Sequence, residues 1–418
     1  MTFEPDPRAA ASPRPGRTQA VDPSLELARR NARRVLAGVS TVAFATSLFS
    51  RAIDPVIPPI ASDLGVTPET VALLSTAFSL PFALIQPVLG PLADTFGKTR
   101  IMTLCLVLLI ATAAIGAIAT SFPVLLASRM LAGIAAGGIF PVSLAIVGDL
   151  VPVAERQIAL GRYLAVVISG NFLGATLAGA IADLIGWRGV FVVIGCCGVA
   201  AFAASRFGFA GQERPSGSRL EIHAIPGLFR AIFGNPRAKI CYAAVFLEGL
   251  AILGLFPYVA LLLLDRGEAR ASIAGLVLGG FALGGVAYAL MVRALLGKFG
   301  ANRLMLGGAI VAALALLGAA FEVPWPAEMV VFGFIGFGFY MLHGCIQVQA
   351  TEIAPGARGA AMALHSFFFF TGQAIGPVFY GFGLIHFGSV TTFLLAALIM
   401  VAVGIFASRL LRERAATA

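Results

Sequence analysis

Four charged residues lie in strongly apolar surroundings and are the first candidates for chemistry. Arg51, Asp54 and Arg129 fall within long hydrophobic runs, and Glu248 follows Lys239 inside another. A charge at the centre of an apolar helix in lipid costs about 2.5 to 3.5 kcal/mol on the insertion scale. Such residues usually pair with one another, line a wet cavity or carry protons, so these four are the predicted proton-coupling or intramembrane-charge residues.

Two explanations stay open for the first three charges. Asp54 and Arg129 lie at similar depths in their apolar segments, which permits a salt bridge between them. Arg51 lies one helical turn from Asp54 and can compete for its carboxylate. The result is either a permanent ion pair joining two helices or a pair that a proton switches.

Glu248 has no obvious basic partner in the linear sequence. Burial favours the neutral form of a carboxyl group, so Glu248 is expected to bind a proton and release it when the site hydrates or a cation arrives. The alternative is a carboxyl that stays protonated and hydrogen-bonded.

Polar and aromatic residues within the apolar runs are candidates for lining a substrate cavity. The histidine among them has a simpler interpretation as a hydrogen-bonded packing residue, and most aromatics here are expected to pack in the membrane. The predicted cavity residues are Phe78, Gln86, Asn171, Phe256, Tyr258, Tyr340, His343 and Gln373.

The composition requires these residues to be positioned by membrane helices. Of 418 residues, 59% are hydrophobic and only 12% are charged, too few to cover a soluble protein of this size. Apolar segments of about 20 residues, each long enough to cross a ~30 Å hydrocarbon core, recur between short polar breaks. We count twelve, so the predicted fold class is an all-α integral membrane protein with twelve transmembrane helices.

The basic residues set the expected orientation. With the N-terminus in the cytoplasm, Arg188, Arg266 and Arg270 lie in outer loops, Arg51 and Arg129 lie within spans, and the rest of the 29 Lys and Arg residues face inward. This bias predicts a multi-pass protein of the cell (inner) membrane with both termini cytoplasmic. Membrane lipid is the expected partner of the positive charge, and no nucleic acid is needed to explain it.

A long polar break divides the spans six and six and suggests an internal repeat. At offsets of 202 and 203 residues, Gly170 maps onto Gly372 and Gly97 maps onto Gly300. The predicted organisation is a disordered cytoplasmic tail, an N-terminal six-helix bundle, a central cytoplasmic loop, a C-terminal six-helix bundle and a second tail. Their ranges are 1–34, 35–209, 210–238, 239–408 and 409–418.

Residues 90–100 read GPLADTFGKTR, which resembles a signature of the major facilitator superfamily. The segment after Arg129 and the start at Trp187 are similar to further motifs of that family. The resemblance implies that Asp94 faces the N-terminus of span eleven and latches a cytoplasmic gate; a loop that only sets turn geometry is the alternative. The predicted gating residues are Gly90, Asp94, Gly97, Lys98 and Arg100.

Span five looks like that of the twelve-helix drug:proton antiporter branch. The glycine spacing is kept at Gly161, Gly170, Gly174 and Gly179, while Ala175 and Ala178 stand where the branch has a proline and a glycine. Glycine pairs at this spacing also allow close helix contact. The predicted packing glycines are Gly133, Gly137, Gly170, Gly174, Gly372 and Gly376.

Together these features predict a secondary transporter that works by alternating access, with proton-coupled efflux of an amphipathic compound as the first hypothesis. One alternative is proton-coupled uptake or exchange of an organic anion or metabolite, motivated by Arg51 and Arg129. Another is a membrane sensor that does not transport. We expect no enzyme, no cofactor and no metal site, because the five cysteines lack ligand spacing and no phosphate loop or nucleophile constellation is present. The expected partners are a small-molecule substrate and protons, and the protein is expected to be a monomer.

Overall fold

The computed structural model of the chain describes residues 23–151, 153–209, 224–321, 323–354 and 358–411. Every regular element in these ranges is an α-helix or a short 3-10 helix. Ten helical stretches among the described residues are long and apolar enough to cross a membrane. The prediction of an all-α protein with many membrane helices is therefore confirmed, while the count of twelve stays a prediction.

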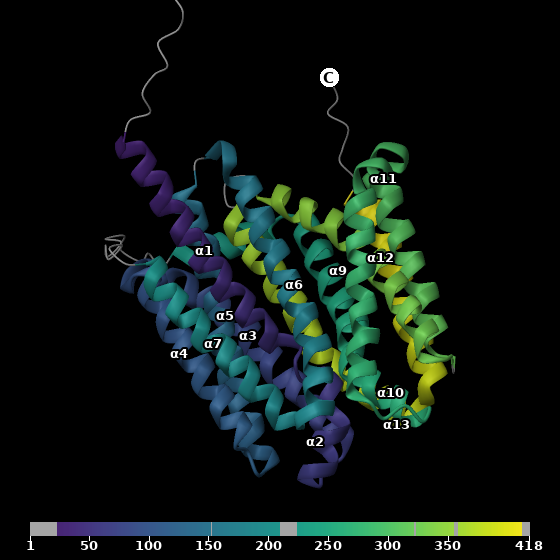
Figure 1. Ribbon diagram of the computed structural model, residues 1–418. Helices are drawn as coiled ribbons and strands as arrows, with labels where there is room; N and C mark the ends of the chain where they lie inside the picture. Colours follow the sequence, from purple (N-terminus) through teal and green to yellow (C-terminus); the bar gives the residue numbers. More distant parts are fainter. Residues whose placement is uncertain (1–22, 152, 210–223, 322, 355–357, 412–418) are drawn as a thin grey trace, which may run out of the picture.

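The helices form two bundles that lie side by side (Figure 1). We call residues 23–209 the N half and residues 224–411 the C half. The N half contains α1 (Pro23–Arg51), α2 (Ile57–Leu64), α3 (Pro68–Phe96), α4 (Lys98–Ala117), α5 (Phe122–Leu150), α6 (Val153–Ile185) and α7 (Trp187–Gly208). The C half contains α8 (Ala224–Phe233), α9 (Pro236–Ile252), α10 (Val259–Asp265), α11 (Ala271–Ala319), α12 (Trp325–Ile353) and α13 (Arg358–Leu410).

The first apolar segment of each half is broken near its end. After α1 the chain forms a 3-10 helix, η1 (Asp54–Val56), and after α9 it forms η2 (Leu253–Tyr258). Pro55 and Pro257 lie in these breaks, and proline removes a backbone donor that a continuing α-helix would need. The break after α1 places Asp54 in irregular backbone, where its carboxylate can meet more than one helix.

Two elements are too long to be single crossings. α11 has 49 residues and α13 has 53, and a straight helix of either length would exceed about 70 Å at 1.5 Å per residue. Each is interrupted by a glycine outside helical geometry, Gly300 with φ 72° and Gly388 with φ 77°. Each therefore consists of two helices that join at a glycine.

Glycines in left-handed backbone recur at the offsets found in the sequence. The six among the described residues form three pairs separated by 202 or 203 residues, namely Gly65 with Gly267, Gly97 with Gly300, and Gly186 with Gly388. A residue with a side chain is strained at such φ values, so these positions require glycine. Chain reversals thus occur at matching places in the two halves.

The predicted packing glycines lie at close helix contacts, where a Cβ atom would meet a neighbour. Gly133 faces the Phe78 carbonyl, Gly137 faces Phe82, Gly170 faces Phe44, Gly174 faces Leu48, Gly372 faces Phe246, and Gly376 faces Gly254 and Leu250. The contacts of Gly170 and Gly174 in the N half match those of Gly372 and Gly376 in the C half at an offset of 202 residues. Because glycine has no side chain, the backbones of the two helices can approach closely, which is the expected role of such glycine pairs in membranes.

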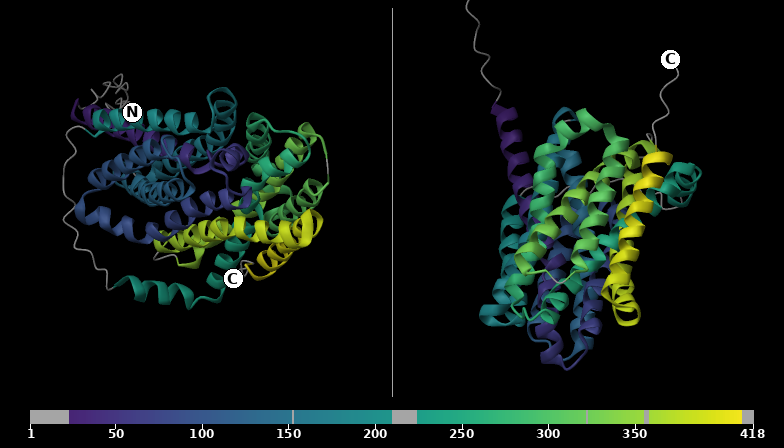
Figure 2. Two further views of the ribbon diagram at one scale, coloured as in Figure 1. Left: turned by 90° about the horizontal axis from the view of Figure 1, so that it is seen from below. Right: turned by 90° about the vertical axis from the view of Figure 1, so that its right-hand side faces the viewer.

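The halves touch mainly along two helix pairs, α3 with α13 and α6 with α11. Hydrogen bonds across the boundary join Thr76 to the Ala374 carbonyl at 2.6 Å and Gln373 to Ser79 at 2.8 Å. The short helices α2 and α10 also contact each other across the boundary, at the end of the molecule opposite the start of α1 (Figures 1 and 2). We call this the α2 end.

Candidate functional site

The charged residues of the N half form a compact buried cluster. Asp54 is fully buried, and its carboxylate is paired with the Arg51 guanidinium at 3.4 Å. The Ser75 hydroxyl donates to the other carboxylate oxygen at 2.7 Å. The Arg51 guanidinium also lies over the Phe256 ring, 4.7 Å from its centroid, so the cluster touches the C half.

Arg129 belongs to this cluster but does not take the expected partner. Its Nη1 donates to the Phe49 carbonyl at 3.0 Å, and its guanidinium lies 4.4 Å from the centre of the Phe78 ring. Phe49 lies in the last turn of α1, where carbonyls lack partners within the helix. The predicted Asp54 to Arg129 salt bridge is thus corrected to an Arg51 to Asp54 pair, because Arg129 satisfies this helix end while Arg51 lies one turn from Asp54.

The C half contains a second titratable cluster. Glu248 on α9 is fully buried, and a 2.9 Å hydrogen bond joins its Oε2 to His343 Nδ1 on α12. The His365 ring on α13 lies 5.2 Å from the His343 ring, centre to centre. Glu248 Oε1 and His365 Nε2 are both buried without a hydrogen-bond partner. Glu248 therefore has the partner that the linear sequence did not reveal, and the cluster retains unused hydrogen-bonding capacity.

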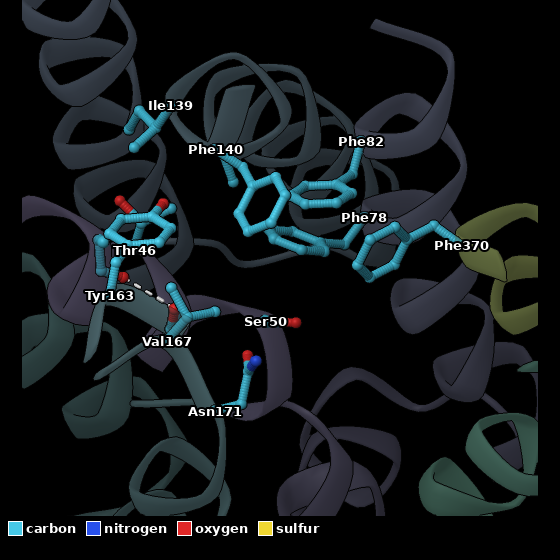
Figure 3. Close-up of a pocket in the computed structure, with 13 residues that line it drawn as sticks. Thr46, Ser50, Phe78, Phe82, Ile139, Phe140, Tyr163, Val167, Asn171 and Phe370 are labelled. Atoms are coloured by element: carbon cyan, nitrogen blue, oxygen red, sulfur yellow. Dashed lines mark hydrogen bonds between the residues drawn. The ribbon is translucent and has the colours of Figure 1, made fainter. Parts of the chain in front are cut away.

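A pocket opens between α1, α3, α5 and α6 (Figure 3). The empty space at this pocket is about 440 Å³, a figure that includes open solvent at its mouth. Thirteen described residues line it, and Phe370 of α13 contributes from the C half. The lining residues are Ala43, Thr46, Ser47, Ser50, Phe78, Phe82, Ala136, Ile139, Phe140, Tyr163, Val167, Asn171 and Phe370.

The predicted cavity residues are distributed over several environments. Phe78 and Asn171 line the pocket. Gln86 is buried on α3, and the Phe256 ring lies under the Arg51 guanidinium. The Tyr258 hydroxyl donates to the Pro377 carbonyl, and the Tyr340 ring packs against Phe281 and Phe339. His343 is hydrogen-bonded to Glu248, and Gln373 is hydrogen-bonded to Ser79 of the other half. The structure thus brings two of the eight to the pocket and uses five others in hydrogen bonds or ring contacts. The contacts of Phe256 and Gln373 cross between the halves.

Part of the predicted gating motif can be described. Gly97 joins α3 to α4 with φ 95°, and Lys98 forms a 2.6 Å ion pair with Asp149 at the end of α5. Arg100 is exposed. The side chain of Asp94 and the surroundings of Gly90 lie outside the described residues, so the latch to span eleven remains a prediction.

At the α2 end, an acidic side chain joins the two halves. The Asp183 carboxylate, near the end of α6, accepts hydrogen bonds from the backbone N–H groups of Ala271 and Ser272 at 2.9 Å each. These residues begin α11, so the carboxylate caps the positive end of a helix from the other half. In the adjoining loop, hydrogen bonds from Arg270 hold the pKa of the exposed Glu268 carboxyl below its usual value.

The pocket and the C-half cluster occupy matching positions in the chain. Thr46, Phe140 and Tyr163 of the pocket precede Glu248, His343 and His365 by 202 or 203 residues. The sequence interpretation did not single out Ser50, Phe140 or Tyr163. Applying the repeat offset to Glu248 and the two histidines would have pointed to Phe140 and Tyr163.

Among the described residues there is no group of three or more His, Cys, Asp or Glu side chains able to hold a metal ion. The chemistry available at these sites is proton binding, hydrogen bonding and aromatic contact.

Comparison with known proteins supplies the family. The family model described as Major Facilitator Superfamily matches residues 39–355 and 268–418. A chloramphenicol resistance protein of Streptomyces lividans is 32% identical over 268 residues, a match that covers 61% of this chain and 64% of that protein, less than two thirds of its length. The quinolone resistance protein NorA of Staphylococcus aureus (strain MSSA476) is 26% identical over 334 residues, covering 78% of this chain and 84% of that one.

A solved structure has the same fold. A bacterial homolog of the human lysosomal transporter Spinster, in an inward-facing and unoccupied conformation, aligns with a TM-score of 0.66 and 19% identity. The alignment covers 90% of this chain and 94% of that one. At this identity the likeness shows the fold alone.

Proposed function

The chain belongs to the Major Facilitator Superfamily, and from this premise we propose that it is a proton-coupled exporter of a small, amphipathic compound across the inner membrane. Its relatives include proteins named for resistance to chloramphenicol and to quinolones. The chain is a multi-pass membrane transporter of this family. Efflux, proton coupling and the nature of the substrate are the proposed parts.

The observation that carries the proposal is the buried carboxyl of Glu248. It lies on α9 with one oxygen bonded to His343 and the other without a partner. A carboxyl in this setting is stable when protonated and costly when charged. Rearrangement of the halves that admits water to Glu248 would release the proton, which couples its movement to alternating access.

We further propose that the chain crosses the membrane twelve times, as two related six-helix bundles with both termini in the cytoplasm. The bundles are residues 35–209 and 239–408. The glycine interruptions of α11 and α13 support the count, and the paired left-handed glycines support the repeat. In this orientation the α2 end faces outward, and the Asp183 contact closes the outer side.

The described contacts support an alternating-access cycle. Because α2, α10 and Asp183 join the halves at the α2 end, we propose that substrate enters from the opposite, cytoplasmic end. The reverse state would close through Asp94, whose carboxylate we propose to meet the start of α13 near Gly359. Formation of one contact and loss of the other would move access from one face to the other.

The test is transport in everted vesicles with an acidic lumen. Addition of an exported compound is expected to discharge the pH gradient, because each molecule that enters the lumen exchanges for protons. In Glu248→Gln the rate should fall at least about tenfold, which corresponds to ~1.4 kcal/mol. Glu352→Gln, which removes an exposed carboxyl of the same half, is the matched control. Discharge by Glu248→Gln at the parent rate would refute the proposed coupling.

Uptake of an organic anion is less favoured by the site. That hypothesis needs Arg51 and Arg129 to face substrate, but both are buried and neither is among the described residues that line the pocket. Accumulation of labelled acids in right-side-out vesicles, lost in Arg51→Ala, would reverse this preference.

A further inference from the structure

We propose that the pocket between α1, α3, α5 and α6 binds an uncharged aromatic compound that carries hydroxyl or amide groups. The inference rests on the proposed transport function and names its substrate class. It also assigns substrate and proton to different halves of the molecule.

The first argument is the absence of charge in the lining. None of the 13 described lining residues is acidic or basic. An ion taken from water into such a site would lose its hydration without gaining a charged partner, which is strongly unfavourable. An uncharged ligand avoids this cost.

The second argument is the charge directly behind the lining. The Arg129 guanidinium lies on the Phe78 ring at 4.4 Å, and its Nε and Nη2 have no hydrogen-bond partner. Among the described residues, the cluster of Arg51, Asp54 and Arg129 holds two guanidinium groups and one carboxylate, which is paired with Arg51, so the cluster carries excess positive charge. This charge repels a cationic ligand. An anion gains little in return, because the Phe78 ring separates Arg129 from the pocket.

The third argument is the shape of the apolar surface. Phe78 and Phe82 stack with their ring centres 6.0 Å apart, and Phe370 meets Phe82 edge-on at 4.6 Å. Phe140 and Tyr163 supply further rings, 6.1 Å apart. Figure 3 shows the rings of Phe78, Phe82 and Phe140 gathered at one side of the pocket. Aromatic walls of this kind favour a flat ring in the ligand, through stacked and edge-on contacts.

The fourth argument is the set of available polar groups. Thr46 and Ser47 donate their hydroxyl protons to carbonyls of their own helix at 2.7 Å. The side chains of Ser50 and Asn171 form no hydrogen bond among the described residues, and both face the pocket (Figure 3). Asn171 can donate and accept, and Ser50 can do the same. These two side chains match hydroxyl and amide groups on a ligand.

The comparison of equivalent positions completes the argument. Where the C half has Glu248, His343 and His365, the N half has Thr46, Phe140 and Tyr163. The group that binds the proton is therefore replaced in the pocket by neutral side chains. Substrate and proton need not compete for one carboxylate, so the substrate does not have to carry positive charge.

The test measures equilibrium binding to the full-length protein purified in detergent, with three aromatic probes of different charge. Chloramphenicol is uncharged, ethidium is a cation and salicylate is an anion. We expect saturable binding of chloramphenicol, with ethidium and salicylate at least about tenfold weaker, a difference of ~1.4 kcal/mol each. Tighter binding of ethidium or salicylate than of chloramphenicol would overturn the proposal.

Variants locate the binding site. Phe140→Ala should weaken chloramphenicol binding about tenfold, since it removes one aromatic wall. Asn171→Asp should strengthen ethidium binding and weaken chloramphenicol binding, because it adds a carboxylate to a pocket lining that has none. Leu84→Ala, on the exposed face of α3, is the control and should leave both unchanged. Unaltered binding in both pocket variants would refute the assigned site.

Binding and transport fail in different ways. Chloramphenicol binding that responds to the pocket variants, in a protein that shows no proton exchange in vesicles, would refute the proposed coupling and leave the pocket assignment standing. Proton-coupled transport of ethidium without chloramphenicol binding would refute the substrate class and leave the coupling intact.

Discussion

The two halves use the same helical positions for different chemistry. In the N half, Thr46 and Phe140 border an open pocket, whereas their counterparts Glu248 and His343 form a buried hydrogen-bonded pair. Nearer the α2 end, the N half has the charged residues and the C half has the apolar ones. Asp54 and Arg129 correspond to Phe256 and Phe332, two buried rings with centres 6.2 Å apart. The two fully buried carboxyls, Asp54 and Glu248, thus lie at different levels along the helices of their halves.

The difference lies in how the two buried carboxyl groups are paired. Asp54 has Arg51 and Ser75 as partners, so its charge is compensated where it stands. Glu248 has one hydrogen bond and a free oxygen. The first arrangement stabilises a charged carboxylate, and the second favours a protonated carboxyl that loses its proton only when water reaches it. We therefore propose that the N-half cluster stabilises the structure and that the C-half cluster exchanges protons.

The largest expected effect is a loss of stability in Asp54→Asn. The change leaves Arg51 and Arg129 without their counter-charge, and an uncompensated buried charge costs about 3 to 5 kcal/mol. Glu248→Gln removes no compensating charge and should leave stability unchanged. The measurement is the unfolding free energy of the purified protein in mixed micelles.

The control for this comparison is Asp63→Asn, which breaks an ion pair with Arg188 at 2.7 Å. Both partners are partly exposed, so the expected loss is below about 1 kcal/mol. Equal destabilisation by Asp54→Asn and Glu248→Gln would contradict the division between the two clusters.

A smaller effect is expected where α5 packs on α3. A methyl group at Gly133 would collide with the Phe78 carbonyl, so Gly133→Ala should cost about 1 to 3 kcal/mol. Gly336→Ala makes the equivalent collision with the Phe281 carbonyl in the C half and should cost a similar amount. Only the first change moves a pocket wall, so only it should also weaken chloramphenicol binding.

Gly148→Ala serves as the control on α5. It has no neighbour within 4 Å of the added methyl group and should leave stability unchanged or slightly raised. Equal loss of binding in Gly133→Ala and Gly336→Ala would show that the binding site does not belong to one half.

The smallest effect is expected at the boundary of the halves. Asp183→Ala removes the acceptor for the Ala271 and Ser272 N–H groups, a cap worth about 1 kcal/mol. Closure of the α2 end should weaken about fivefold, visible as faster hydrogen exchange at these two amides. Asp149→Ala, which breaks the Lys98 pair within the N half, should leave their exchange unchanged. Unchanged exchange in Asp183→Ala would remove Asp183 from the outer closure.

Sequence reasoning identified the fold because each membrane helix has a recognisable local pattern in the sequence. Apolar length reveals a span, and a glycine pair such as Gly372 and Gly376 reveals a close contact. The same local signals do not reveal that the first span is interrupted at Pro55 before it continues into α2. A break of this kind is decided by contacts with other helices as much as by the proline itself.

The candidate site was predictable by residue type and less so by pairing. A charge such as Glu248 is conspicuous in an apolar segment, but its partner His343 lies 95 positions away on another helix. Arg129 was expected to meet Asp54 and instead donates to a backbone carbonyl, which no side-chain pattern encodes. The pocket was more difficult to predict than the charged residues. Ser50 and Phe140 have no distinctive signal in the sequence, and they line a pocket only because four helices pack together.

Phe370 gives the pocket a property that its other walls do not have. Of the described lining residues it alone comes from the C half, so it leaves the pocket whenever the halves part on that side. A ligand that presses on Phe370 binds more tightly before the halves part than afterwards, and by linkage it holds the transporter in that state. Substrates must therefore bind weakly to the Phe370 ring, and an aromatic compound that binds strongly to it would be an inhibitor.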